Sequence, residues 1–272
     1  MHKNSFKFTT IIIWLFLSST LVNAATRILP LGDSITYDTR FDDTRSVSKR
    51  TGYRSHLWYQ LSDANFGADF VGSKIAGQAI VPAFDPQNEG HPGWDQFEIA
   101  EETYKYMNNS QPDIVLLHIG TNDRTTTNPA GINDILNYID LYEAENDTNV
   151  RVYVALIIDR LEKDGRIRIF NRRLAQLLRQ RIANGDDIII VDMYNNANLN
   201  SSDYADITHP NDRGYQKMAN VWFNALITNF NPELSAFPYS LVNPVHIEYS
   251  STNKEGTTIN IITAVPDYGI TF

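Results

Sequence analysis

Two short segments far apart in this chain carry the residues that a serine nucleophile needs. Gly32–Thr36 (Gly-Asp-Ser-Ile-Thr) follows an apolar run, and Asp206–Pro210 (Asp-Ile-Thr-His-Pro) lies far downstream. A serine hydroxyl is a weak nucleophile unless a neutral imidazole takes its proton, so Ser34 needs a base such as His209. Asp206 can hold that imidazole in the tautomer that faces the hydroxyl. The two segments therefore predict acyl transfer by Ser34, with His209 as base and Asp206 as its orienting group.

Two further segments offer donors for the negative charge that acyl transfer creates. They are Gly93-Trp94 and, after a second apolar run, Gly120-Thr121-Asn122-Asp123. Preorganised donors at the developing oxyanion are usually the largest single contribution to catalysis. We predict an oxyanion hole formed by the backbone N–H groups of Ser34 and Gly93 and the side-chain amide of Asn122.

Some of these residues also have a purely structural interpretation. Gly, Asp and Ser are common in turns and helix caps, so the Gly-Asp-Ser tripeptide alone is a weak signal. Gly90 competes with Gly93 as the oxyanion glycine, and Asp123 is interpreted as a structural residue or a helix cap. The presence of all four segments in this order favours the catalytic interpretation.

Taken together, the four segments resemble the SGNH (also called GDSL) hydrolase superfamily. Four residues match those for which the superfamily is named: Ser34, Gly93, Asn122 and His209. The resemblance covers roughly residues 26–229. A closer resemblance is to the acetylxylan esterases of carbohydrate esterase family three, and it is carried by Ile28–Thr36, Glu89–Trp94, Asp113–Asp123 and His209–Ala219.

The resemblance implies a carbohydrate O-acetylesterase whose substrate is acetylated xylan or a related polysaccharide. Trp94 and Tyr37 are candidate substrate contacts, because aromatic faces suit sugar rings as well as acyl chains. The alternatives are a broad-specificity esterase, a lysophospholipase or a thioesterase with the same catalytic residues. A more distant alternative is a non-catalytic carbohydrate-binding protein on the same scaffold.

Composition narrows the chemistry and the partners. The net charge of −9 argues against nucleic acid as a partner, since nucleic-acid-binding faces favour Lys and Arg. The chain has no cysteine, which excludes a thiolate metal site and a cysteine nucleophile. Its histidines lack the spacing of common zinc motifs. We expect no cofactor and no metal, and an acetylated polysaccharide or another ester as the partner.

Residues 1–24 have the three parts of a secretory signal. Basic residues come first, an apolar run from Ile11 to Leu17 follows, and Val22-Asn23-Ala24 precedes the expected cleavage site. A membrane anchor is the alternative, but the apolar run is shorter than the roughly 20 residues that a spanning helix needs. We expect a secreted or periplasmic protein without stable membrane insertion after cleavage.

Strand and helix signals alternate along residues 25–229, which predicts a three-layer α/β hydrolase domain. The expected strands form a five-stranded parallel sheet: Arg27–Leu31, Asp69–Gly72, Asp113–Ile119, Arg151–Ile158 and Asp187–Asp192. The expected helices are Tyr53–Ala64, Trp94–Met107, Ile132–Glu143, Ile167–Ala183 and Asp212–Ile227. The resemblance implies a flavodoxin-like arrangement, in which strand ends bring Ser34 and Asn122 to one edge.

Residues 230–272 differ from the preceding part of the chain in their sequence pattern, and they are predicted to form a short β-rich extension. Val245–Tyr249 and Thr258–Ile262 alternate like strands on either side of Asn253-Lys-Glu-Gly256, which indicates a hairpin. The resemblance does not cover this part of the chain.

Overall fold

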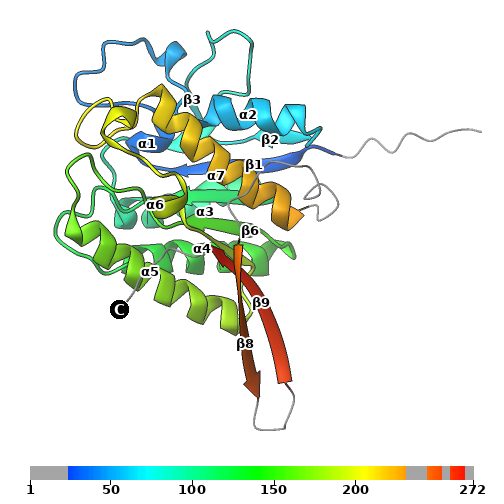
Figure 1. Cartoon of the computed structure of the whole chain (residues 1–272). Coiled ribbons are helices and arrows are strands. Elements are labelled where there is room, and N and C mark those ends of the chain that lie inside the picture. Colours follow the sequence, from blue (N-terminus) through cyan, green and yellow to red (C-terminus); the bar gives the residue numbers. More distant parts are fainter. Residues whose placement is uncertain (1–23, 231–243, 253–257, 267–272) are drawn as a thin grey trace, which may run out of the picture. The chain divides into compact units, whose positions relative to one another are not determined.

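A mixed sheet built around β1 organises the main part of the computed structural model, which describes residues 24–230, 244–252 and 258–266 (Figure 1). Its strands follow the order β3-β4-β1-β5-β6-β7, and β2 also pairs with β1. Every pair is parallel except β3 with β4. The strands are β1 (Thr26–Gly32), β2 (Ala68–Phe70), β3 (Lys74–Ile75), β4 (Gln87–Gly90), β5 (Ile114–His118), β6 (Arg151–Ala155) and β7 (Ile188–Val191).

All five strands expected from apolar runs occur, as β1, β2, β5, β6 and β7, but the sheet has seven strands rather than five. The two additional strands are β3 and β4. β2 pairs with the first half of β1 and β4 with its last two residues. β4 reads Gln-Asn-Glu-Gly and β3 only Lys-Ile, so neither has the apolar run by which strands are recognised.

The order β2-β1-β5-β6-β7 is the flavodoxin-like order 2-1-3-4-5. In such sheets the strand order reverses beside the first strand, and ligands bind outside the carboxyl ends of the strands at that point. Here the reversal lies between β1 and β5, so the segments that follow these two strands emerge side by side.

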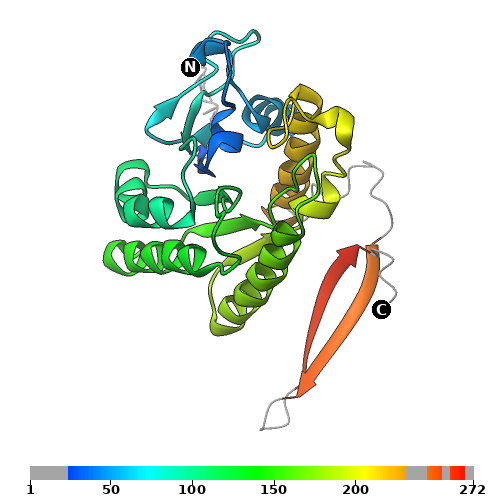
Figure 2. The same ribbon diagram turned by 90° about the vertical axis from the view of Figure 1, so that its left-hand side faces the viewer.

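Helices cover both sides of the sheet (Figures 1 and 2). The five expected long helices are present as α2 (Tyr53–Asp63), α3 (Gln96–Ser110), α4 (Ala130–Asn146), α5 (Gly165–Asn184) and α7 (Asp212–Phe230). A helix that begins at Ser34 was also expected from the sequence, and it is present as α1 (Ser34–Tyr37). Sequence patterns missed three short elements: α6 (Met193–Asn196) and the 3-10 turns Val47–Lys49 and Ser201–Asp203. Capping residues define several of the helix ends. Asp95 and Glu98 form a capping box at the start of α3, and Gly185 ends α5 in the left-handed conformation.

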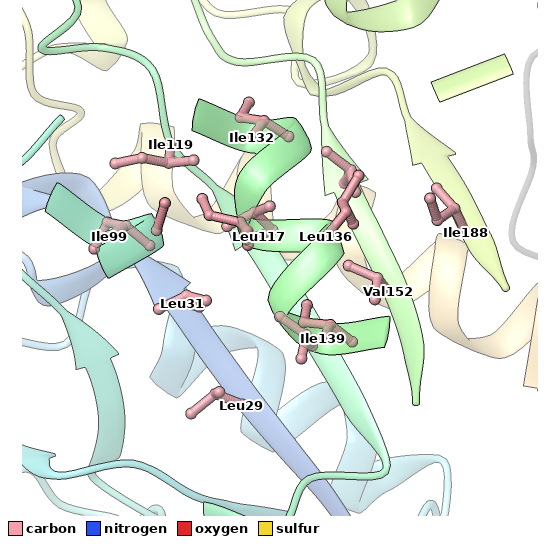
Figure 3. Close-up of a cluster of buried hydrophobic side chains, with 14 of the residues drawn as sticks. Leu29, Leu31, Ile99, Leu117, Ile119, Ile132, Leu136, Ile139, Val152 and Ile188 are labelled. Atoms are coloured by element: carbon pink, nitrogen blue, oxygen red, sulfur yellow. The ribbon is translucent and has the colours of Figure 1, made fainter. Parts of the chain in front are cut away.

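One face of the sheet packs against α3, α4 and α5 in a single hydrophobic cluster (Figure 3). Alternate residues of β1, β5 and β6 meet one side of each helix. The cluster includes Leu29, Leu31, Leu117, Val152, Ile99, Ile132, Leu136 and Ile139. Each such side chain stabilises the fold by about 1.5–3 kcal/mol on burial. The continuous apolar sequences of β5 and β6 follow from burial on both faces.

The opposite face lies under α2 and α7. Tyr53 of α2 and Trp222 of α7 are fully buried, with ring centroids 6.0 Å apart. Phe70 of β2 and Tyr153 of β6 are also fully buried. The sheet is therefore covered on both sides, as the three-layer prediction requires.

The end of the chain forms a second compact unit, which begins at Leu226. It contains β8 (Pro244–Thr252) and β9 (Thr258–Pro266), which pair antiparallel from Pro244 with Pro266 to Thr252 with Thr258. The expected hairpin strands are thus present. The loop between them and nearly all of the expected signal at residues 1–24 lie outside the described residues, and the division at residue 229 stays a prediction. No helix within the described ranges combines the length and apolar character needed to cross a bilayer.

Candidate active site

Ser34 lies at the junction between β1 and α1. β1 ends at Gly32, Asp33 caps the helix by accepting from the Ile35 N–H at 2.9 Å, and Ser34 is the first helical residue. The first N–H groups of a helix have no partner within the helix. The Ser34 N–H is therefore available to a ligand, at the carboxyl edge of the sheet where the sequence placed it.

His209 faces Ser34 directly. Its Nε2 lies 2.9 Å from Ser34 Oγ, and its Nδ1 lies 2.8 Å from Asp206 Oδ2. An ionised carboxylate can only accept, so Nδ1 carries the proton and the lone pair of Nε2 accepts from the serine hydroxyl. Residues that are 175 positions apart thus form the hydrogen-bond chain Ser34–His209–Asp206.

Asp206 is held in its ionised form by the turn that carries it. Burial acts to raise its pKa, but the backbone N–H groups of His209 and Thr208, each donating to Oδ1 at 2.7 Å, and the imidazole outweigh that effect. The net result is a pKa below the ordinary aspartate value. The carboxylate therefore stays charged under mildly acidic conditions.

The loop that carries Asp206 and His209 is anchored to α7 by Asp203. This carboxylate is fully buried and accepts from Arg213 Nε at 2.6 Å and Lys217 Nζ at 2.8 Å. Burial alone would raise its pKa, but these cations and the Asn200 N–H lower the pKa to about 2. An isolated β-bridge between Tyr204 and Pro210 closes the loop. Sequence reasoning missed Asp203, because its partners are recognisable only once α7 is folded.

The Asn122 side chain lies beside the segment that contains Gly93. Asn122 Nδ2 donates to the Trp94 carbonyl at 2.8 Å. A side-chain amide carries two N–H groups, so one remains for a substrate oxygen. Gly93 has a φ of 86°, and its N–H donates to no protein atom among the residues that the structure describes. The predicted oxyanion donors thus have free hydrogen atoms.

Gly90, the competing glycine, is a poorer donor. Its N–H already donates to Asn88 Oδ1 at 3.0 Å. A Cβ at Gly90 would also lie 2.6 Å from the Tyr37 nitrogen, so this glycine is needed for close packing against α1. Tyr37 and Trp94 are both partly buried, and substrate contact by either of them stays a proposal.

A buried arginine, Arg54 of α2, holds the far end of α1. All the hydrogen bonds of its guanidinium in the described residues go to main-chain carbonyls rather than to carboxylates. Burial lowers its pKa to about 10. The guanidinium instead donates to the main-chain carbonyls of Thr36, Tyr37, Arg50, Ala76 and Pro86. These bonds tie the helix that begins with Ser34 to the segment before α2 and to the loop between β3 and β4.

Two carboxylates, the fully buried Asp33 and the partly buried Asp123, lie in the segments that carry the predicted oxyanion donors Ser34 and Asn122. Burial raises the pKa of Asp33 to about 7. The Ile35 N–H and the nearby Thr121 hydroxyl favour the charged form and lower the pKa, but burial outweighs them. Burial likewise raises the pKa of Asp123 to about 6. Asp123 accepts from Gln96 Nε2 at 2.8 Å. Its role is therefore structural, as one of the two interpretations proposed, and it caps no helix.

A loop between β6 and α5 bridges the two halves of the site, and the sequence did not single it out. Arg160 Nη2 donates to the Thr121 carbonyl at 2.9 Å. On the other side, the Leu161 N–H donates to the Ile207 carbonyl at 3.0 Å. The loop thereby fastens the Asn122 segment to the His209 segment. Across the described ranges, no group of three or more His, Asp or Glu side chains is placed to hold a metal ion.

Comparison with known proteins gives the class of this chain. It belongs to the GDSL-like Lipase/Acylhydrolase family, which matches residues 31–217. The chain is thus a carboxylic ester hydrolase of the GDSL type. It is 29% identical over 228 residues to a multidomain esterase of Ruminococcus flavefaciens, a match that covers 74% of this chain and 28% of that protein. The chain therefore spans little more than a quarter of this relative.

Solved structures with similar folds include carbohydrate esterases. A family 3 carbohydrate esterase of Clostridium thermocellum has a TM-score of 0.65 at 27% identity, covering 78% of this chain and 98% of that one. One from Talaromyces cellulolyticus has a TM-score of 0.60 at 27% identity, covering 75% and 97%. An acetyl esterase mutant with acetate ion has a TM-score of 0.62 at 28% identity, covering 75% and 97%.

Proposed function

We propose that this esterase removes O-acetyl groups from carbohydrate, with acetylated xylan or a related polysaccharide as substrate. The observation that carries the reaction is the 2.9 Å contact between Ser34 Oγ and His209 Nε2, with Asp206 bound to the other ring nitrogen. The similarity to family 3 carbohydrate esterases and to an acetyl esterase supports the substrate class.

In the first half of the reaction, Ser34 Oγ attacks the acetyl carbonyl carbon and its proton passes to His209 Nε2. The carbonyl oxygen becomes negatively charged and accepts from the N–H groups of Ser34 and Gly93 and from Asn122 Nδ2. The intermediate then collapses. The bond from the carbonyl carbon to the sugar oxygen breaks, and His209 gives its proton to that oxygen, which leaves as a free hydroxyl.

The second half releases acetate by the reverse proton path. A water molecule loses a proton to His209 Nε2 as its oxygen attacks the acetyl-Ser34 carbonyl. The ester bond to Ser34 Oγ breaks, and His209 returns the proton to the serine. Asp206 stays ionised throughout and stabilises the imidazolium that forms in each half-reaction.

The test of this function is acetate release from a panel of acetylated sugars and polymers, including acetylated xylan. We expect release by the wild-type chain and none by Ser34→Ala. A fluorophosphonate should label Ser34 stoichiometrically in the wild type. Acetate release that persists in Ser34→Ala would exclude this mechanism, and a folded wild type that neither labels nor turns over would favour a non-catalytic binding protein.

A broad acyl esterase is the second candidate, because the family to which the chain belongs includes lipases and acylhydrolases. Rates on p-nitrophenyl esters of increasing chain length separate the two. A carbohydrate acetylesterase prefers acetate strongly and acts on acetylated xylan. Comparable or higher rates on long-chain esters, without release of acetate from polymer, would identify the broad esterase.

We also propose export, with residues 1–24 acting as the signal. Fusing residues 1–24 to a reporter, beside a matched fusion in which charges replace apolar residues between Ile11 and Leu17, tests the segment. Export of the first fusion alone, with cleavage after Ala24, is the expected result. Retention of both fusions in the cell would refute export.

A further inference from the structure

The turn at residues 91–94 controls two of the three proposed oxyanion donors. The Trp94 N–H donates to the His91 carbonyl at 3.2 Å, Pro92 occupies the second position, and Gly93 has a φ of 86° at the third. These are the features of a type II turn. Its internal bond uses the N–H of Trp94, which leaves the N–H of Gly93 free to point toward a ligand.

The same turn fixes the orientation of Asn122. The Trp94 carbonyl accepts one of the two N–H groups of Asn122 Nδ2 at 2.8 Å. This bond fixes the rotation of the amide and so aims the remaining N–H. A displacement of Trp94 would therefore move Asn122 together with Gly93, and two donors would be lost at once.

A buried hydrogen-bonded pair, Glu89 with His91, lies next to this turn. Glu89 is fully buried, and its Oε1 lies 2.7 Å from His91 Nε2. Ser73 completes the carboxylate's partners through its N–H and its hydroxyl, both at 2.7 Å. Burial acts to raise the pKa of Glu89, but His91 and Ser73 outweigh it and lower the pKa. The charged carboxylate therefore holds the His91 ring with its proton on Nε2.

The His91 ring passes this constraint to Trp94. The Trp94 ring stacks on it at a centroid distance of 4.2 Å and an interplanar angle of 25°, and Tyr106 of α3 stacks on it at 5.1 Å and 21°. The main-chain N–H of His91 also donates to the carbonyl of Gly32 at 2.8 Å, and Gly32 lies two residues before Ser34. The hydrogen bond to Glu89 thus restricts rotation of the imidazole within its plane. The stacked rings of Trp94 and Tyr106 restrict its movement perpendicular to that plane.

We propose that Glu89 and His91 are positioning residues of the oxyanion hole, acting through the Trp94 ring and carbonyl on Gly93 and Asn122. The proposal rests on the proposed function, because it presumes an oxyanion at this place. It predicts an effect on kcat, since the oxyanion exists only beyond the ground state, and little effect on KM. A pair that merely stabilised the fold would change the amount of folded protein and leave kcat per active serine unchanged.

The experiment compares His91→Phe, which keeps a flat ring but removes the N–H, with the wild type on p-nitrophenyl acetate. Rates are expressed per serine labelled at the end point by a fluorophosphonate. We expect kcat to fall about 10- to 100-fold, within the loss caused by removal of one oxyanion donor, with KM changed less than about twofold. Glu89→Gln keeps an acceptor for His91 but loses the charge, so its kcat should fall less than that of His91→Phe. Glu98→Gln, at a nearby glutamate on α3, is the matched control and should keep the wild-type kcat.

A double-mutant cycle with Asn122→Ala separates positioning from general damage. The part of the effect that passes through Asn122 is absent in the Asn122→Ala background, whereas the part that passes through Gly93 remains. His91→Phe should therefore lower kcat clearly less in that background than it does alone. Equal losses in both backgrounds, or a wild-type kcat in His91→Phe and Glu89→Gln, would overturn the proposal. If His91→Phe fails to fold, Glu89→Gln is carried through the same cycle and decides. Retained activity in Ser34→Ala would instead refute the proposed function.

Discussion

Gly32 approaches His118 so closely that a Cβ on the glycine would lie 2.3 Å from the His118 carbonyl oxygen. The two residues are register partners at the ends of β1 and β5. This contact sets the separation of the two chain segments that leave the sheet toward Ser34 and Asn122. It also leaves room for no side chain other than hydrogen at position 32.

Gly32→Ala is therefore expected to destabilise the protein and to disturb the site. The added methyl group would also lie 2.5 Å from Thr36 Oγ1, so β1, β5 or α1 must shift. We expect a loss of about 1–3 kcal/mol in the free energy of unfolding, measured by urea denaturation. Gly67→Ala is the control, because its nearest neighbour is an atom of Ala25 at 3.9 Å. Equal stability of the two variants would contradict the argument from close packing.

Asn122→Ala should lower kcat by about 10²- to 10³-fold while the fold is retained. The alanine removes both N–H groups, one bound to Trp94 and one proposed for the oxyanion. Steady-state kinetics on p-nitrophenyl acetate and the circular dichroism spectrum provide the measurements. Asn146→Ala removes an asparagine that binds a main-chain carbonyl in the same way at the end of α4, and it should keep full activity. Unchanged turnover in Asn122→Ala would remove this residue from the mechanism.

Asp206→Asn should reduce kcat by up to about 10⁴-fold, because a neutral amide no longer selects the tautomer with the proton on Nδ1 or stabilises the imidazolium. The amide oxygen can still accept from the N–H groups of Thr208 and His209, so the turn should persist. Kinetics together with thermal unfolding separate these effects. A variant with kcat within tenfold of the wild type would show that the carboxylate charge is dispensable.

Asp33→Asn should remove a pH-dependent cost of folding. The unfolded chain releases the Asp33 proton near pH 3.8, whereas the folded protein holds it up to about pH 7. Raising the pH across this window therefore lowers the free energy of unfolding, on the order of a few kcal/mol, and the asparagine variant lacks this loss. Its amide oxygen can still accept from the Ile35 N–H.

Urea denaturation of both proteins between pH 4 and pH 8 measures this difference. His118 contributes the opposite slope, because burial lowers its pKa to about 4, but it is present in both proteins and cancels. We expect the variant to gain stability relative to the wild type as the pH rises from about 4 to about 7. Stability curves that stay parallel would show that Asp33 is ionised in the folded state.

The sequence already contained the main framework. Apolar runs in β5, β6 and β7 and the long helices between them could be read directly, because burial imposes its pattern on the local sequence. β4 could not be found in this way. Its residues Gln-Asn-Glu-Gly form a strand because the end of β1 offers a free edge, and that edge exists only in the folded sheet.

The sequence by itself determined which groups are available for the reaction: a serine after β1, an asparagine after β5, and an aspartate and histidine on one late turn. Their chemical types and order depend only on the chain. The tertiary structure alone decided that Gly93 rather than Gly90 has a free N–H, and that Glu89 and His91 stand behind the turn that carries it. A hydrogen-bond partner is a matter of distance and direction: folding turns the Asn88 amide oxygen toward the Gly90 N–H and brings Trp94 to Asn122.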